Sequence, residues 1–314
     1  MFQLFLIRQE CESIIAFSFP VTSTRKENMM SSSMIFKTYD ELDFTDDFMF
    51  GKVMGDKELC REVLECLLQQ PVGELTEVQT QREFKYVSDG KPIRLDVYNE
   101  DSEKRVYDAE MQNLNHKSLE SLQLPKRSRF YQSSIDVDYL DKTADYSTLP
   151  ESNVIFICTF DPFKQGLSKY TFKECCEEDP RILLKDGTRK IFYNCTYKGI
   201  DIPKNLRKLY DYIERKQIDN DLTKKINDAV NKARKNEKWR SEFMKERIIL
   251  QDARAEGKEE GLAQGRAEGI EEGRNEQIKS MLSRGKTVEQ IVEFCGYTYE
   301  QVKTVEEGML QTVE

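Results

Sequence analysis

The feature that most constrains the fold is a group of polar side chains inside two consecutive strand-like segments, 93–98 and 105–112. Side chains alternate between the two faces of a strand, so Glu110 and Gln112 share one face. If the two segments pair as a hairpin, Asp96 reaches the same face. Two carboxylates this close repel each other unless a divalent cation lies between them, and Mg²⁺ prefers such a sparse oxygen set completed by water and phosphate. The spacing therefore predicts a metal site for phosphodiester chemistry.

Other carboxylates compete for the same role. Asp108 shares a face with Glu110 by parity, so the hairpin register decides which of the two meets the metal. A lone strand carboxylate is usually a solvated residue, and it is the joint occurrence of Asp96, Glu110 and Gln112 that favours a site. Asp47, or the adjacent Asp46, offers a third carboxylate, but acidic residues also stabilise the first turn of a helix.

Expected helices and strands follow one another along the first two thirds of the chain. Apolar side chains at helical spacing predict two helices, and Pro125 stands near the start of a third. The continuous apolar run 153–159 is typical of a strand covered on both faces. The expected helices are 47–54, 56–68 and 125–139, and the expected strands are 77–84, 93–98, 105–113, 153–159, 170–176 and 190–195. This order predicts an α/β fold.

Four segments carry a resemblance to a known family: 47–54, 94–98, 107–112 and 124–132. Together they resemble the PD-(D/E)XK nuclease superfamily and, within it, the recombination-promoting nuclease and transposase family, over the stretch from Asp47 to about Arg215. The resemblance implies a restriction-endonuclease-like core with a mixed central sheet flanked by helices, followed by an all-helical C-terminal extension. Gln112 stands where the superfamily motif has lysine, and in this family the position often carries glutamine.

The resemblance also implies roles for individual residues. Asp96, Glu110 and the backbone carbonyl of Met111 would hold Mg²⁺, with Asp47 as an additional candidate ligand. Gln112 cannot ionise, so it can position a water but cannot take its proton. Candidate DNA contacts are Lys52, Lys126, Arg127, Arg129, Tyr131 and Gln132. For Tyr131 a place in the core is the alternative, and for Lys52 a solvated surface position is the alternative.

Composition limits the binding partners that the protein can have and indicates its cellular compartment. The net charge of −9 argues against electrostatic attraction of DNA by the chain as a whole, so DNA binding requires a local basic patch such as the one around Arg127. Eight cysteines without a CxxC pair, and a single histidine, argue against zinc. Reduced thiols within apolar runs suit the cytosol, and by resemblance we expect a bacterial cytoplasmic protein. The apolar segments near the N-terminus are too short to span a bilayer, so no membrane partner is expected.

We expect four regions. Residues 1–38 read as a disordered or misassigned extension, with Met29, Met30 or Met34 as alternative starts, and residues 39–218 as the nuclease-like domain. Residues 219–282 form a helical extension and residues 283–314 a small helical hairpin, in which Thr287 and Thr298 each begin a capping-box pattern. We interpret this hairpin as a packing module rather than a DNA reader.

Glycine recurs at every fourth residue within the helical extension, at 257, 261, 265, 269 and 273. Each costs about 1 kcal/mol against alanine in a helix. One interpretation is close packing against a partner helix, including homo-oligomerisation, and the other is a solvated spacer.

These observations favour a Mg²⁺-dependent DNA endonuclease linked to recombination or mobile elements. The alternatives are a catalytically inactive nuclease fold that binds nucleic acid or another partner, and an interaction protein whose function lies in the glycine-repeat helix.

Overall fold

The structure, a computed structural model, describes residues 37–84, 93–114, 119–140 and 145–311. Two compact units divide the described part of the chain, one within Phe36–Lys245 and one within Glu246–Glu314. The first unit extends beyond the boundary expected at residue 218, because helix α7 (Asp221–Arg234) buries Ile226 and Val230 in the main core. The expected extension over residues 1–38 lies outside the described residues except for its last two.

The first unit is built on one mixed sheet. Its strands are β1 (Leu75–Phe84), β2 (Ile93–Asp101), β3 (Val106–Gln112), β4 (Ser152–Cys158), β5 (Lys169–Phe172) and β6 (Thr188–Asn194). They lie in the order β1-β2-β3-β4-β6-β5, where β3, β4 and β6 run parallel and the other neighbours pair antiparallel. Every residue of the central strand β4 is buried, as its apolar run predicted. The expected strand 170–176 ends at Phe172, and Cys175 pairs instead with Leu183 in an isolated bridge.

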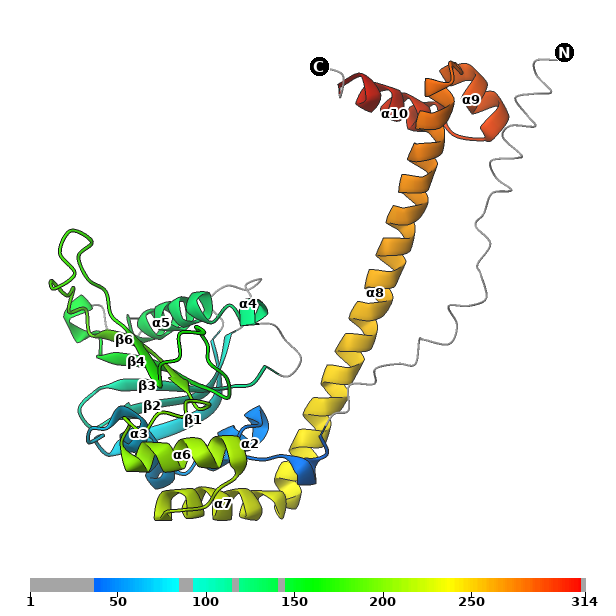
Figure 1. Ribbon diagram of the computed structural model, residues 1–314. Coiled ribbons are helices and arrows are strands. Elements are labelled where there is room, and N and C mark those ends of the chain that lie inside the picture. The colour runs from blue at the N-terminus through cyan, green and yellow to red at the C-terminus, as the bar shows by residue number, and fades with distance from the viewer. Residues whose placement is uncertain (1–36, 85–92, 115–118, 141–144, 312–314) are drawn as a thin grey trace. The chain divides into compact units, whose positions relative to one another are not determined.

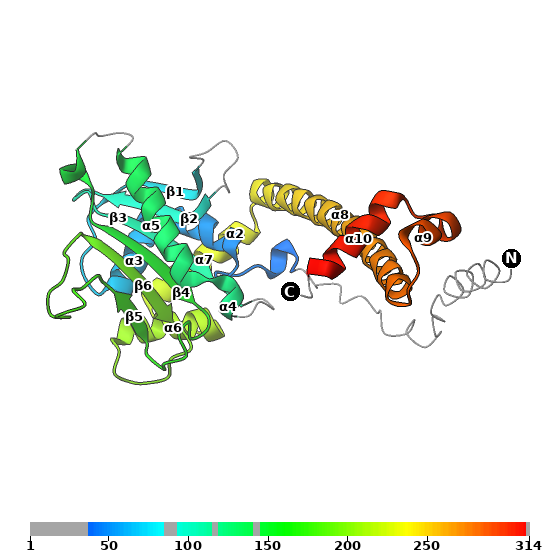
Figure 2. The ribbon, with the colours of Figure 1, turned by 90° about the horizontal axis from the view of Figure 1, so that it is seen from above.

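Helices cover both faces of this sheet (Figures 1 and 2). One face carries α2 (Asp47–Met54), α3 (Lys57–Leu68), α6 (Lys204–Arg215) and α7, which pack on Ala109, Met111 and other sheet residues. The opposite face carries α5 (Leu124–Leu140) and the short α4 (Leu119–Leu122), whose core partners include Phe156 and Phe192. Residues 108, 110 and 112 alternate along β3 with Ala109 and Met111, so their side chains point toward the α5 side of the sheet. The fold positions the predicted polar group under α5.

Local chemistry explains the helices next to the sheet. The side chain of Asp56 accepts a hydrogen bond from the backbone of Leu59 at 3.0 Å and caps α3, whose buried face includes Val63 and Leu67. The same helix ends at Gln69, which adopts the left-handed conformation with φ 56°. Short 3₁₀ helices lie at Tyr39–Glu41 and Tyr146–Thr148.

Helix α8 (Glu237–Ser283) continues from the first unit into the second, where α9 (Val288–Cys295) and α10 (Tyr299–Gln311) follow. The capping box at Thr287 is confirmed, and Gly296 ends α9 with φ 73°. A small apolar cluster of Ile278, Ile291 and Val302 joins the three helices. The glycine-repeat segment is helical, and a Cβ added at any of its five glycines would meet nothing within 4 Å. No helix in the described ranges combines the length and apolar character needed to cross a membrane.

Candidate active site

The two carboxylates predicted to meet do so where β2 and β3 separate. The last paired residues there are Val97 and Ala109. Beyond that pair, the backbone N–H of Asp96 donates to Glu110 Oε1 at 2.9 Å, and the backbone N–H of Met111 donates to Asp96 Oδ2 at 3.3 Å. Each carboxylate thus accepts a hydrogen bond from the strand that carries the other.

The register of the hairpin also distinguishes Glu110 from Asp108, the other carboxylate on the same face of β3. Asp108 lies opposite Tyr98, one step inside the paired part of the hairpin. Its side chain is fully buried, and neither carboxylate oxygen has a hydrogen-bond partner. Glu110 is therefore the carboxylate that faces Asp96, and Asp108 lies deeper on the same face.

A pocket of about 300 Å³ opens at this point. The residues that line it are Asp47, Arg94, Asp96, Glu110, Met111, Gln112, Asn113, Leu122 and Arg127. The pocket unites the predicted acidic residues and Gln112 with Asp47 from α2 and Arg127 from α5. Arg94, Asn113 and Leu122 were not among the predicted site residues, although the first two lie within two residues of a predicted one in sequence.

The pocket is acidic, and Glu110 is buried in it while Asp96 is half-buried. Burial raises the pKa of Asp96 to about 7, with a further contribution from Asp47. Burial also raises the pKa of Glu110 and of Asp108, and the negative charge of Asp96 adds to both shifts. Because bringing these charges together costs free energy, the arrangement is one that a bound cation would stabilise.

Two arginines, Arg94 and Arg127, bring positive charge to the pocket, and Arg127 is the one that contacts Glu110 and Gln112. Its guanidinium donates to Gln112 Oε1 at 2.8 Å and to Glu110 Oε2 at 3.3 Å. It also donates to the hydroxyl of Tyr131, whose ring is buried and stacks on Phe156. Tyr131 therefore belongs to the core, as the alternative interpretation of Tyr131 stated. Its hydroxyl also holds the guanidinium of Arg127.

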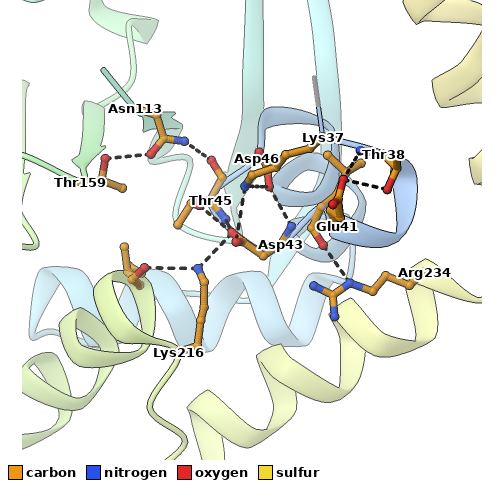
Figure 3. A network of polar contacts seen from close by, with 12 residues as sticks. Lys37, Thr38, Glu41, Asp43, Thr45, Asp46, Asn113, Thr159, Lys216 and Arg234 are labelled. Atoms are coloured by element: carbon orange, nitrogen blue, oxygen red, sulfur yellow. Dashed lines mark hydrogen bonds and ion pairs between the residues drawn. The ribbon is translucent and has the colours of Figure 1, made fainter. Parts of the chain in front are cut away.

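Asp47 reaches the pocket because a polar network anchors the segment before α2 (Figure 3). Asp43 accepts hydrogen bonds from Thr45 and from Lys216 at the end of α6, at 2.6 and 3.0 Å from their side chains. Asn113, directly after β3, donates to the carbonyl of Thr45 and accepts from Thr159 at 2.8 Å. The end of β3 is thereby tied to Thr45, two residues before α2 begins, so Asp47 and Glu110 are held on one framework.

The remaining candidate DNA contacts differ in their exposure and partners. Lys126 and Arg129 are exposed on α5, where a phosphate can reach them. Gln132 differs from its prediction: it is 5% exposed, and its amide donates to Ser152 and Asp136, because this side of α5 packs on β4. Lys52 lies outside the pocket and forms an ion pair with Glu242 at 2.6 Å.

The residues present fit a magnesium ion better than a metal that needs a full protein cage. Within the ranges that the structure describes, no three His, Cys, Asp or Glu side chains form a metal-binding cluster. Mg²⁺ is commonly held by only one or two carboxylates and keeps several waters and substrate phosphate oxygens as its other ligands. Asp96, Glu110 and the carbonyl of Met111 supply hard oxygen donors of that kind.

Fold and pocket together define a nuclease-like α/β domain with paired carboxylates where two strands diverge. The comparison with protein families agrees, since residues 41–195 match the model described as PD-(D/E)XK nuclease family transposase, and this part of the chain belongs to that family. The match supports a nuclease-type hydrolase with a nuclease or transposition-related function. The comparisons with curated proteins and with solved structures gave no match.

Proposed function

We propose that this protein is a Mg²⁺-dependent endonuclease that hydrolyses phosphodiester bonds in DNA. The observation that carries the proposal is the pair of crossed hydrogen bonds between Asp96 and Glu110 and the backbone of the opposite strand. These bonds hold two carboxylates toward one pocket although burial raises the pKa of each, with the charge of Asp47 adding to the shift of Asp96 and the charge of Asp96 adding to that of Glu110. A fold that keeps such costly charges together favours a cation-dependent role.

Each pocket residue has a role that follows from its chemistry. Asp96, Glu110 and the carbonyl of Met111 would hold the ion, which when bound supplies Lewis-acid polarisation of a phosphate and a lowered pKa of water. Asp47 lies in the same pocket and adds negative charge. Gln112 cannot act as a base, so it serves to orient a reacting group by hydrogen bonding.

DNA would approach over α5. Lys126 and Arg129 are exposed there, and Arg127 of the same helix lines the pocket and contacts Glu110. Lysine and arginine bind phosphate through charge-assisted hydrogen bonds, so this helix offers a local basic surface on a protein of net charge −9. A role in recombination or mobile elements and a cytoplasmic location belong to the same proposal, and they rest on the family match.

The test is nicking of supercoiled plasmid by purified protein with Mg²⁺, Mn²⁺, Ca²⁺ or EDTA. We expect nicking with Mg²⁺ or Mn²⁺ and its loss in Glu110→Gln, which keeps the shape of the side chain and removes its charge. Asp138→Asn is the matched control, because this partly buried carboxylate of α5 pairs with Arg82 outside the pocket. Equal nicking by Glu110→Gln and the control would contradict the proposal. DNA binding without metal-dependent cutting would favour the alternative of an inactive nuclease fold.

A further inference from the structure

The guanidinium of Arg127 is directed into the protein rather than outward. Beside its bonds to Gln112 and Glu110, its Nε and Nη2 atoms donate to the Tyr131 hydroxyl at 3.2 and 2.8 Å. A guanidinium has five N–H donors, and these contacts occupy most of them. Arg127 is therefore poorly placed to serve mainly as a phosphate contact, which was its predicted role.

Aromatic rings fix the position of this charge. The guanidinium carbon of Arg127 lies 5.3 Å from the ring centroid of Tyr131 and 5.6 Å from that of Phe156. The two rings stack on each other with centroids 6.1 Å apart. Because Phe156 lies on the fully buried strand β4, the arginine is held on a rigid surface that continues into the core.

The arginine in turn determines how the amide of Gln112 points. Its Oε1 accepts from Arg127 Nη1 at 2.8 Å, while its Nε2 faces Glu110 Oε2 at 3.5 Å. Rotating the amide would set its NH₂ group against the guanidinium and its oxygen against the carboxylate, and both contacts would be repulsive. Gln112 therefore offers an N–H donor, as a lysine ammonium at the same place would, while the positive charge comes from Arg127.

We infer that Arg127 is a positioning residue of this site, which fixes the amide of Gln112 and supplies from α5 the positive charge that a lysine on β3 would carry. This inference rests on the proposed nuclease function. It explains how a neutral residue at 112 is compatible with the chemistry. A lysine there would supply both a positive charge and an N–H donor. Here Arg127 on the helix supplies the charge, and Gln112 on the strand supplies the donor.

The test moves the charge from the helix back to the strand. The variants are Arg127→Met, Gln112→Lys and the double variant, and the control is Arg215→Met, at an exposed arginine of α6 on the other face of the sheet. We expect kcat to fall about 100-fold in Arg127→Met, the usual scale for loss of one preorganised donor, with KM for DNA altered no more than in the control. Gln112→Lys alone should also lose activity because it sets a second cation beside Arg127. The double variant should recover to within about tenfold of wild type.

Metal binding gives a readout that does not depend on turnover. Calorimetric titration with Mn²⁺, above the pH at which Asp96 titrates, should give the tightest binding in Arg127→Met and the weakest in Gln112→Lys. Wild type and the double variant should lie together between them, because their pockets have the same net charge. Thermal melting identifies any variant that fails to fold. If Arg127→Met fails, Arg127→Lys serves in its place, and it should keep the Mn²⁺ affinity of wild type while lowering kcat.

Three results would overturn the inference. One is unchanged kcat with raised KM in Arg127→Met, which would make Arg127 a phosphate contact. Another is a double variant no more active than the weaker single variant. The third is a Mn²⁺ affinity that does not follow the charge of the pocket. A wild-type protein that neither binds Mn²⁺ nor nicks DNA would instead refute the proposed function itself.

Discussion

Replacing Asp96 with asparagine should make the metal-free protein more stable, although it removes a residue central to the site. The pKa of Asp96 is raised from 3.8 to about 7, first by burial and next by Asp47. The native protein therefore binds this proton more tightly than the unfolded chain does, and the free energy of unfolding falls as the pH rises from about 4 to about 7. Asparagine keeps the size and the hydrogen-bond acceptor of the side chain and removes the charge.

The magnitude follows from that shift. Each tenfold change in proton affinity corresponds to ~1.4 kcal/mol, so the full shift corresponds to about 4 kcal/mol. Solvent screens a partly exposed carboxylate, and we expect an observed gain of about 2 kcal/mol in unfolding free energy near pH 8. Near pH 4 the gain should approach zero, because Asp96 is then protonated in the native wild type and carries no charge.

The assay is urea unfolding of both proteins in EDTA across this pH range. Asp101→Asn is a control of opposite sign, since hydrogen bonds and charge from Arg105 outweigh the effect of burial and lower the pKa of Asp101. That variant should lose stability at neutral pH, and the loss should shrink as the pH falls through the lowered pKa. Added Mg²⁺ should stabilise wild type and leave Asp96→Asn unchanged. An Asp96→Asn protein that is less stable than wild type at pH 8, or whose difference does not vary with pH, would refute the reasoning.

Three further predictions concern other parts of the chain. Alanine at both Lys126 and Arg129 should weaken DNA binding and reduce the dependence of log K on log salt by about 2, measured by fluorescence anisotropy at several salt concentrations; an unchanged slope would place the DNA surface elsewhere. If the glycines of α8 face solvent, Gly261→Ala with Gly265→Ala should raise the stability of the helix by up to ~1 kcal/mol per site, because an added Cβ meets nothing within 4 Å. Loss of an oligomer in analytical sedimentation would instead indicate that the glycines pack against a partner helix. Burial acts to raise the pKa of Asp43, but hydrogen bonds from Thr45 and Lys216 hold it at about 2. Asp43→Asn should therefore destabilise the protein at neutral pH, with the loss disappearing as acid urea unfolding passes from about pH 4 to about pH 2.

Local sequence patterns were sufficient to place the core of the site. The two-residue period of strands set Glu110 and Gln112 on one face, and the turn between β2 and β3 brought Asp96 to the same face. The apolar run of β4 and the capping box at Thr287 were likewise legible, because each depends on residues that are neighbours in the chain. The assignment of the α/β fold followed from the order of these elements.

Packing between distant segments decided the rest. No local pattern shows that Gln132 faces β4 and not solvent, or that α7 belongs to the main core, because both depend on which helix face meets the sheet. The contact between Arg127 and Gln112 joins residues on a helix and a strand, and it forms only when α5 lies across β3. The sequence by itself determined which charged and polar residues line one strand face, since the geometry of a strand is local. Only the tertiary structure decided which of them meet, because burial and the approach of α5 set their partners, their pKa values and the direction of the amide.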